Sequence, residues 1–201
     1  MSWIKTINYE EAESSLKKMY DRVKGPNNNV DNILLAHSLR PHTLLGHMTL
    51  YKNVLHNSNN TLPKWYLEAL GVYVSYLNAC EYCFEHHYSG FKRLYDNDEK
   101  SEQFRNAVIQ DDMSQFFEGR ELAGARYAKK LTIQQDQMNQ EDVIALRSSG
   151  FSDGEILEIN QVVSYFNYAN RTVVGLGVTT DGDILGLSPN NSNDPNNWNH
   201  D

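Results

Sequence analysis

The chain has 201 residues, of which 40% are hydrophobic and 22% are charged, and its formal net charge is −8. This composition is ordinary for one globular domain, and the negative charge argues against nucleic acid or an anionic membrane as the main partner. No segment approaches the roughly 18 apolar residues of a membrane span, and residues 1–6 lack the basic-then-apolar pattern of a signal peptide. We therefore expect a cytoplasmic protein.

Helix signals recur along the chain, whereas the alternating pattern of β-strands is almost absent, so we expect an all-α fold. Near the N-terminus, Asn8 and Glu11 have the spacing of a capping box and predict an amphipathic helix that continues to Val23. Gly25-Pro26 should end this helix. A short helix around residues 33–37 should follow.

The next two predicted helices cover residues 42–56 and 63–78, and Pro63 suits the first turn of the second. The first of them should bury an apolar face made of Leu44, Leu45, Met48, Tyr51 and Leu55. Asn78 and Glu81 again have a capping-box spacing. If Asn78 is an N-cap, the helix breaks there, and both cysteines of the chain lie in the first turns of a new helix.

The second half of the chain should contain four more helices, over residues 98–110, 115–131, 140–148 and 153–171. The last of these begins with a capping box formed by Ser152 and Glu155. Residues 172–187 are glycine-rich and irregular, and residues 188–201 are too rich in Asn, Asp and Pro to build a core. We expect one helical domain over residues 1–187 and an Asn-rich tail over residues 188–201, held in place by a contact such as a neighbouring subunit.

One short segment occurs twice. Val74–Asn78 recurs almost unchanged at residues 163–167, an offset of 89 positions that aligns Cys80 with Ala169 and His87 with Leu176. An internal duplication would give a second helix that acts as a scaffold and lacks the reactive groups. Chance similarity between two helices is the alternative.

The two cysteines of the chain, Cys80 and Cys83, are three residues apart, and His87 follows four residues later. On one helix these three side chains would share a face. Two thiols that can form a disulfide, next to a group that can take a proton, make a compact redox unit. In a reducing cytosol such a pair is more often redox-active or metal-binding than a structural disulfide.

Two other interpretations of the cysteines compete with this one. Free cysteines can serve as small buried hydrophobic residues, but the redox spacing would then be a coincidence. A structural zinc site would use both thiolates and His86 or His87, yet it needs four ligands, and the remaining histidines have no paired spacing near the motif. The redox interpretation is favoured.

The residues alone leave open which sulfur is the nucleophile. Cys80 would lie nearer the N-terminus of a helix, whose dipole favours a thiolate. Cys83 has His87 one helical turn away as a base or an imidazolium partner. In either case a sulfenic acid on one sulfur would be resolved by the other as a disulfide.

Glu68 is a further candidate, twelve residues before Cys80. On an unbroken helix it would lie about 18 Å away and could not serve the thiols. With a break at Asn78, the two helices could fold back and place Glu68 beside His87, where a carboxylate would orient the imidazole and raise its basicity. The alternative is a surface ion pair with Lys64.

These residues resemble the alkylhydroperoxidase D-like (AhpD-like) family of the carboxymuconolactone decarboxylase-like superfamily. The family pattern is a glutamate, eleven residues, then Cys-x-x-Cys-x-x-x-His, and this chain matches it with Glu68, Cys80, Cys83 and His87. Further segments resemble the peroxidase-related branch, namely Asn32–Leu34, Ser38–Pro41, Val74–Asn78, Tyr165–Arg171 and Gly175–Gly177.

The resemblance implies an all-α fold, assembly as a homo-oligomer, and thiol-dependent reduction of hydroperoxides in antioxidant defence without a cofactor. It makes Cys83 the peroxidatic thiol and Cys80 the resolving thiol and proton donor. It also makes His87 and Glu68 a proton relay. An external dithiol protein would reduce the disulfide again.

Three neighbouring side chains complete the expected site. Tyr76 and Tyr82 should form a pocket wall, and His86 is a second ring that could face the thiols. The alternatives to a peroxidase are a disulfide reductase or thiol-transfer protein, and a non-enzymatic redox-sensing or zinc-binding module. The lactone decarboxylase activity is disfavoured, because that chemistry does not use a dithiol.

Overall fold

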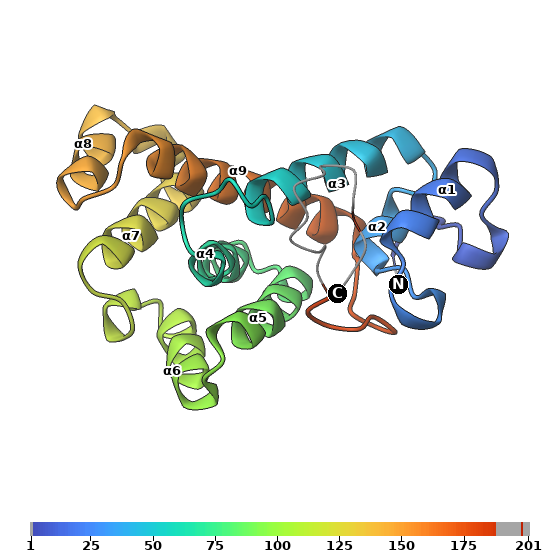
Figure 1. Ribbon diagram of the computed structural model, residues 1–201, viewed down its shortest axis with the longest axis horizontal. Helices are drawn as coiled ribbons and strands as arrows, with labels where there is room; N and C mark the ends of the chain where they lie inside the picture. Colours follow the sequence, from blue (N-terminus) through green and yellow to red (C-terminus); the bar gives the residue numbers. More distant parts are fainter. Residues whose placement is uncertain (1, 188–197, 199–201) are drawn as a thin grey trace.

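The computed structural model of the protein describes residues 2–187 and residue 198, and within this part the chain forms helices and loops without a strand (Figure 1). The helices are α1 (Ser14–Val23), α2 (Asn32–Ala36), α3 (Pro41–Leu55), α4 (Lys64–Leu77), α5 (Glu81–Tyr95), α6 (Asp98–Ile109), α7 (Gly119–Ile133), α8 (Gln140–Ser148) and α9 (Asp153–Leu176). The predicted all-α class is confirmed. Of the described helices, none is long and apolar enough to cross a membrane.

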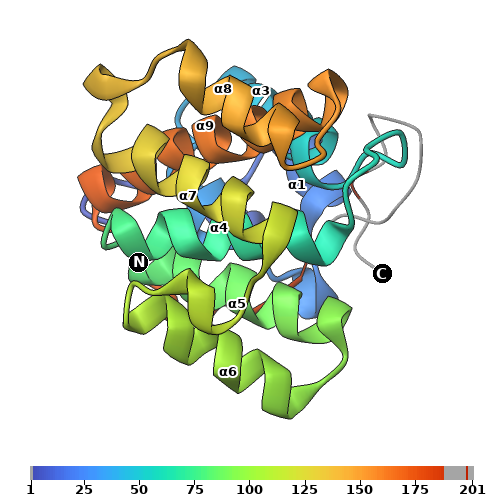
Figure 2. The same cartoon turned by 90° about the vertical axis from the view of Figure 1, so that its left-hand side faces the viewer.

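Helix α4 lies in the middle of the molecule, with α7 on one side and α5 on the other (Figure 2). Every residue from Tyr66 to Ser75 is buried, as expected for a helix that is covered all round. Helix α9 also packs against α4, and the ring of Phe166 lies so close to Gly71 that a Cβ atom there would come within 2.1 Å of it. Among these buried residues Glu68 is the one charged side chain, which marks this helix as part of a site.

A second group of buried side chains joins α1, α2 and α3. It includes Tyr20, Leu44 and Met48, together with Trp198. The indole of Trp198 lies 3.7 Å from the guanidinium of Arg22, measured to the ring centroid. A contact within the chain therefore holds this one described residue of the tail, and the rest of the tail prediction lies outside the described residues.

The predicted start of the first helix is wrong. Asn8 makes no side-chain cap, and Tyr9–Glu11 form a separate 3-10 turn before α1 begins. Tertiary contacts explain the difference, because they hold Tyr9 in place. Lys17 Nζ donates to the Tyr9 carbonyl (2.9 Å), and Lys24 Nζ donates to the Tyr9 hydroxyl (2.7 Å).

Two later boundaries also differ from the prediction. Helix α7 begins at Gly119, because Gln115 belongs to a short 3-10 turn instead. Helix α9 runs to Leu176, beyond the predicted end at Arg171, and stops at Gly177, whose left-handed backbone (φ 60°) suits glycine. The predicted capping box at the start of α9 is confirmed.

The predicted buried face of α3 is right in part. Leu44, Met48 and Leu55 are buried, but Leu45 is 42% exposed. His47 takes a place on the buried face, because this face of α3 packs against the aromatic side chains of α9. His47 also lines the cavity of the candidate site.

Candidate active site

The turn between α4 and α5 builds the site. The chain breaks where predicted, but the cap is different, because Cys80 and not Asn78 is the N-cap of α5. Ala79 takes a left-handed backbone (φ 53°) to make the turn. The Asn78 amide donates instead to the side-chain oxygens of Asn167 (3.1 Å) and Asn170 (2.9 Å) on α9. The capping-box interpretation of Asn78 is therefore wrong, and α9 holds the turn.

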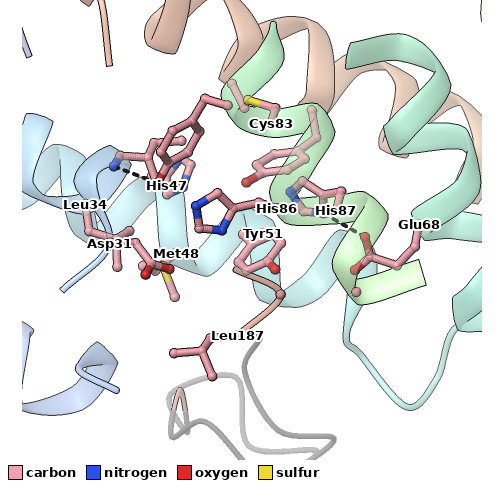
Figure 3. A pocket seen from close by; sticks show the side chains of 16 residues that line it. Asp31, Leu34, His47, Met48, Tyr51, Glu68, Cys83, His86, His87 and Leu187 are labelled. Carbon is pink, nitrogen blue, oxygen red and sulfur yellow. Dashed lines mark hydrogen bonds and ion pairs between the residues drawn. The ribbon is translucent and has the colours of Figure 1, made fainter. Parts of the chain in front are cut away.

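The helical hairpin brings Glu68 beside His87, as a break at Asn78 predicts (Figure 3). Glu68 Oε2 lies 2.6 Å from His87 Nδ1, and the carboxylate is only 3% exposed. The interpretation of Glu68 as a surface partner of Lys64 is therefore wrong. On its other side, the ring of His87 meets Phe166 edge to face at 4.5 Å between centroids. The imidazole is thus held from two directions.

The carboxylate of Glu68 determines which ring nitrogen of His87 carries the hydrogen in their hydrogen bond. Burial alone would raise the pKa of Glu68, but the charge and hydrogen bond of His87, with weaker effects of His56 and Arg93, lower it overall. An ionised carboxylate can only accept a hydrogen bond, so His87 Nδ1 carries the hydrogen that it donates to Glu68. The other ring nitrogen, Nε2, is then the one that can exchange a proton with a reactant.

The two thiols are buried and unequal. Cys80 is 1% exposed and Cys83 is 3% exposed, and both are free thiols. A hydrogen bond from the Cys83 thiol lowers the pKa of Cys80, whereas burial, followed by the interaction with Cys80, raises the pKa of Cys83. The first proton to leave the pair therefore leaves a thiolate on Cys80, at the N-terminus of α5. Cys83 needs a base to become a nucleophile.

Asn170 belongs to the site, although the sequence did not indicate it as a site residue. Its side chain is fully buried on α9, where it adds to the lowering of the Cys80 pKa that Cys83 causes and partly opposes the raising of the Cys83 pKa by burial. Its Nδ2 also donates to Ser75 Oγ on α4 at 3.1 Å. Because Asn170 lies 90 positions after Cys80, no local pattern in one sequence links the two residues.

Cys83, and not Cys80, opens into a narrow cavity of about 50 Å³ (Figure 3). That volume is a few times the roughly 10–15 Å³ that one water needs. Glu68, His87 and Tyr82 line the same cavity, together with the aromatic rings of Tyr51 and Tyr165. The cavity thus joins a thiol to the histidine–glutamate pair in a space that suits a small substrate.

The two tyrosines expected in the pocket wall lie on different sides of the hairpin. Tyr82 lines the cavity at Cys83. Tyr76 is 36% exposed, and its hydroxyl donates to the carbonyl of Ile109 at 2.7 Å, beside Cys80 and away from the cavity. Only one of these two tyrosines, Tyr82, is therefore part of the cavity wall.

His86 lines the cavity as well, but it has a different partner. Its Nε2 lies 3.2 Å from Asp183 Oδ2, an oxygen that also accepts a hydrogen bond from the Tyr82 hydroxyl at 2.7 Å. Both oxygens of Asp183 accept from the backbone N–H of Asn32. Asp183 therefore fastens the segment after α9 to α2 and α5, and His87 is the ring that pairs with Glu68.

Two more titratable side chains, His47 and Asp31, line the cavity. His47 is 4% exposed, its Nδ1 has no hydrogen-bond partner, and burial, with smaller effects of His37 and His87, lowers its pKa to about 3. Burial raises the pKa of Asp31 to about 7, with Asp183 raising it further and His86 opposing the shift. His47 is therefore a neutral imidazole at any pH near neutrality. Among the described residues, no three His, Cys, Asp or Glu side chains are placed to hold a metal ion.

Comparison with known proteins identifies the fold. No protein-family model and no curated protein sequence matches the chain. Solved structures do match it, including the AhpD core of an uncharacterised peroxidase-related protein from Ralstonia eutropha JMP134. That protein is 20% identical with a TM-score of 0.75, over 89% of this chain and 91% of that one.

Two further structures extend the comparison. An uncharacterised peroxidase-related protein from Silicibacter sp. TM1040 is 23% identical with a TM-score of 0.71, over 81% of this chain and 83% of that one. The debrominase Bmp8 is 17% identical with a TM-score of 0.70, over 87% and 89%. The protein therefore has an AhpD-like fold.

Proposed function

We propose that the protein is a thiol peroxidase that reduces hydroperoxides with Cys80 and Cys83 and acts in antioxidant defence. The observation that carries the proposal is the 2.6 Å contact between Glu68 and His87 in the same narrow cavity as the Cys83 thiol. Because the pKa of Cys83 is raised, this thiol needs a base, and the fact that His87 and Glu68 line the same cavity supports His87 as that base. The likeness to peroxidase-related proteins of the same fold supports the same chemistry.

The first half of the proposed reaction oxidises Cys83. His87 Nε2 takes the thiol proton, directly or through one water, while Glu68 holds the imidazolium. The Cys83 thiolate then attacks the distal oxygen of the hydroperoxide, and the O–O bond breaks. The alkoxide takes the proton from His87 and leaves as an alcohol, so that Cys83 becomes a sulfenic acid.

The second half closes the disulfide. The Cys80 sulfur attacks the Cys83 sulfur, and the hydroxide that leaves takes up the Cys80 proton by way of His87 to form water. The lowered pKa of Cys80 suits this step, because the resolving sulfur is readily ionised. An external dithiol reductant then restores both thiols. Assembly as a homo-oligomer stays a prediction.

A second candidate uses the same dithiol on a halogenated aromatic ring. The cavity walls of Tyr51 and Tyr165 favour such a ring, and a variant of Bmp8 has been crystallised with 2,3,4-tribromopyrrole. In that reaction a carbon–bromine bond is replaced by a carbon–hydrogen bond, the two thiols become a disulfide, and hydrogen bromide is released. The cavity of about 50 Å³ favours the smaller hydroperoxide.

A comparison of substrates tests the proposal. With dithiothreitol as reductant, we would measure turnover of tert-butyl hydroperoxide, of 2,3,4-tribromopyrrole and of a small disulfide, hydroxyethyl disulfide. The proposal predicts the highest kcat/KM for the hydroperoxide. A higher value for the bromopyrrole would favour the dehalogenase, and a higher value for the disulfide would favour a disulfide reductase.

A further inference from the structure

The turn between α4 and α5 has a second hollow, which shares no lining residue with the narrow cavity. This groove has a volume of about 580 Å³, and its lining includes Cys80 and the largely apolar side chains of Tyr76, Leu77, Phe84 and Ile109. Cys80 lines the groove and not the cavity, whereas Cys83 lines the cavity and not the groove. The two sulfurs of one redox pair therefore adjoin two separate spaces. We call the second space the Cys80 groove.

We propose that the Cys80 groove binds the reductant, a thiol that carries an apolar group beside its sulfur, and that this thiol attacks Cys80 of the oxidised protein. The inference deepens the proposed function and rests on it, because it concerns the disulfide that a hydroperoxide would form. Substrate and reductant would then enter from opposite sides of the hairpin. Neither would have to leave before the other binds.

The direction of attack on a disulfide supports this division. A thiolate displaces one sulfur of a disulfide by approaching the other sulfur in line with the S–S bond. To displace Cys83, the reductant must reach Cys80 from the side away from Cys83. Of the two cysteines, only Cys80 lines the Cys80 groove, which suits this approach, and the volume of the groove falls in the range of roughly 300–1,000 Å³ found for small-molecule sites.

The exchange balances in two steps. The first thiolate bonds to Cys80 and releases Cys83 as a thiolate, which takes up one proton. A second thiolate, or the second sulfur of a dithiol, then attacks the reductant sulfur of this mixed disulfide. The reductant leaves as a disulfide and Cys80 leaves as a thiolate, which the Cys83 thiol stabilises by a hydrogen bond. Two electrons pass from the reductant to the protein in these steps, with one proton taken up at Cys83, and protonation of the Cys80 thiolate then restores the second free thiol.

The charges around the groove define what else the reductant should carry. Cys80 is the N-cap of α5, so the positive end of the helix dipole favours an incoming thiolate. Arg105 adds a cation, but its guanidinium is paired with Glu85 at 2.7 Å, and Glu81 also lines the groove. The side-chain charges therefore give no net attraction. Apolar contacts in the groove must therefore recognise the part of the reductant beyond its sulfur.

The test uses two thiols and two matched variants. The disulfide is made with diamide, and its reduction is followed with 2-naphthalenethiol as the apolar probe and dithiothreitol as the polar one. Ile109→Glu places a carboxylate in the groove, and Ile133→Glu makes the same change on α7, outside the groove. The two isoleucines are 48% and 49% exposed, so both variants should fold. The ratio of the two rate constants removes any general effect of the substitution.

We expect Ile109→Glu to lower the preference for 2-naphthalenethiol by at least about threefold, because a charged group disrupts apolar contact. Ile133→Glu should keep the wild-type preference. Rapid alkylation followed by digestion should find the probe on Cys80. A probe found on Cys83, or equal preferences in the two variants, would overturn the inference.

The design separates this inference from the proposed function. Diamide forms the disulfide whether or not the protein reacts with hydroperoxides. If the protein does not react with hydroperoxides but the diamide-formed disulfide still behaves as expected, the peroxidase proposal fails and the reductant site stands. If hydroperoxides oxidise the protein but the two variants behave alike, the peroxidase proposal stands and the reductant site fails.

Discussion

The segments at residues 74–78 and 163–167 have almost the same sequence, yet they end differently. The first belongs to α4, which stops at Leu77 and turns back through Ala79, whereas the second lies inside α9, which continues to Leu176. The two asparagines that end these segments, Asn78 and Asn167, are hydrogen-bonded to each other at 3.1 Å. The broken helix thus uses the unbroken one as a support for its turn.

The difference explains how the site is built. The break makes Cys80 an N-cap and lets α5 fold back, so that His87 reaches Glu68. The unbroken helix supplies the fixed side of the site, in the ring of Phe166 and the amide of Asn170. Local sequence is therefore not enough to decide which helix breaks. The duplication itself stays a hypothesis.

The largest effect should come from the carboxylate on the broken helix. We expect Glu68→Gln to lower kcat/KM for tert-butyl hydroperoxide by about 100-fold or more, because an amide can no longer hold an imidazolium at His87. The position 89 residues later on α9 is Leu157, which is 59% exposed, and Leu157→Gln should leave turnover unchanged. Steady-state kinetics of both variants checks this. A Glu68→Gln protein as fast as the wild type would remove the relay.

The contact between α3 and α9 should make the free energy of unfolding depend on pH. His47 packs against Tyr165 with 5.8 Å between ring centroids, and burial keeps its pKa near 3, compared with 6.5 when unfolded. The unfolded chain therefore binds the proton more tightly, and stability is lost as the pH falls below the unfolded value. At about pH 4.5 the loss from this group should be about 2–3 kcal/mol.

Urea unfolding of the wild type and of His47→Phe at neutral and acid pH checks this prediction. Asp31 shifts stability the other way, because burial raises its pKa to about 7 and the folded state then gains stability as the pH falls. The relevant quantity is therefore the difference between wild type and variant. Between neutral pH and about pH 4.5 the wild type should lose about 2–3 kcal/mol more stability than the variant, and equal losses in the two proteins would contradict the prediction.

The amide that joins the two helices should affect both stability and the thiols. Asn170→Ala should cost about 1–3 kcal/mol, because it removes the hydrogen bonds that Asn170 makes with Asn78 and Ser75 in the interior. It should also raise the pKa of Cys80, which loses a hydrogen bond. Asn167→Ala is the control, since Asn167 contacts Asn78 and Thr132. The control should lose stability only.

Urea unfolding and titration of the thiolate by ultraviolet absorbance separate these two effects. A shift of the thiol pKa in Asn170→Ala alone would support a specific contact. The same shift in both variants would mean that it follows from loosened packing.

The smallest effect should come from the turn itself. Ala79 has a positive φ of 53°, so Ala79→Gly should raise the free energy of unfolding by up to about 1 kcal/mol. The equivalent position on α9 is Tyr168, and Tyr168→Gly should lower it by about 1 kcal/mol or more, because glycine weakens a helix interior. In thermal unfolding, we expect Ala79→Gly to be more stable than the wild type and Tyr168→Gly to be less stable. Equal signs would mean that the turn is not strained.

Sequence could predict how the proposed reactive residues are arranged because the signals for this arrangement are local. The spacing of Cys80, Cys83 and His87 and the turn residues around Asn78 all lie within ten positions. The position of Glu68 beside His87 could be predicted once a break at Asn78 was assumed. The structure adds that Cys80, and not Asn78, caps the new helix.

The rest of the site could not be predicted, because it depends on tertiary contacts. Asn170 and Asp183 reach the site from about 90 and 100 positions away, and a single sequence has no pattern that links them to the cysteines. His47 was missed for a different reason. The apolar periodicity favoured Leu45 as the buried residue, and packing against the rings of α9 chose the histidine.

The most direct test of the account is to trap the oxidised sulfur. Reduced wild type and Cys80→Ser would each react with tert-butyl hydroperoxide in a single turnover, with dimedone present to capture a sulfenic acid. We predict a Cys80–Cys83 disulfide in the wild type and a dimedone adduct on Cys83 in the variant, both formed within seconds. Thiols that stay reduced for minutes at millimolar peroxide would contradict the account.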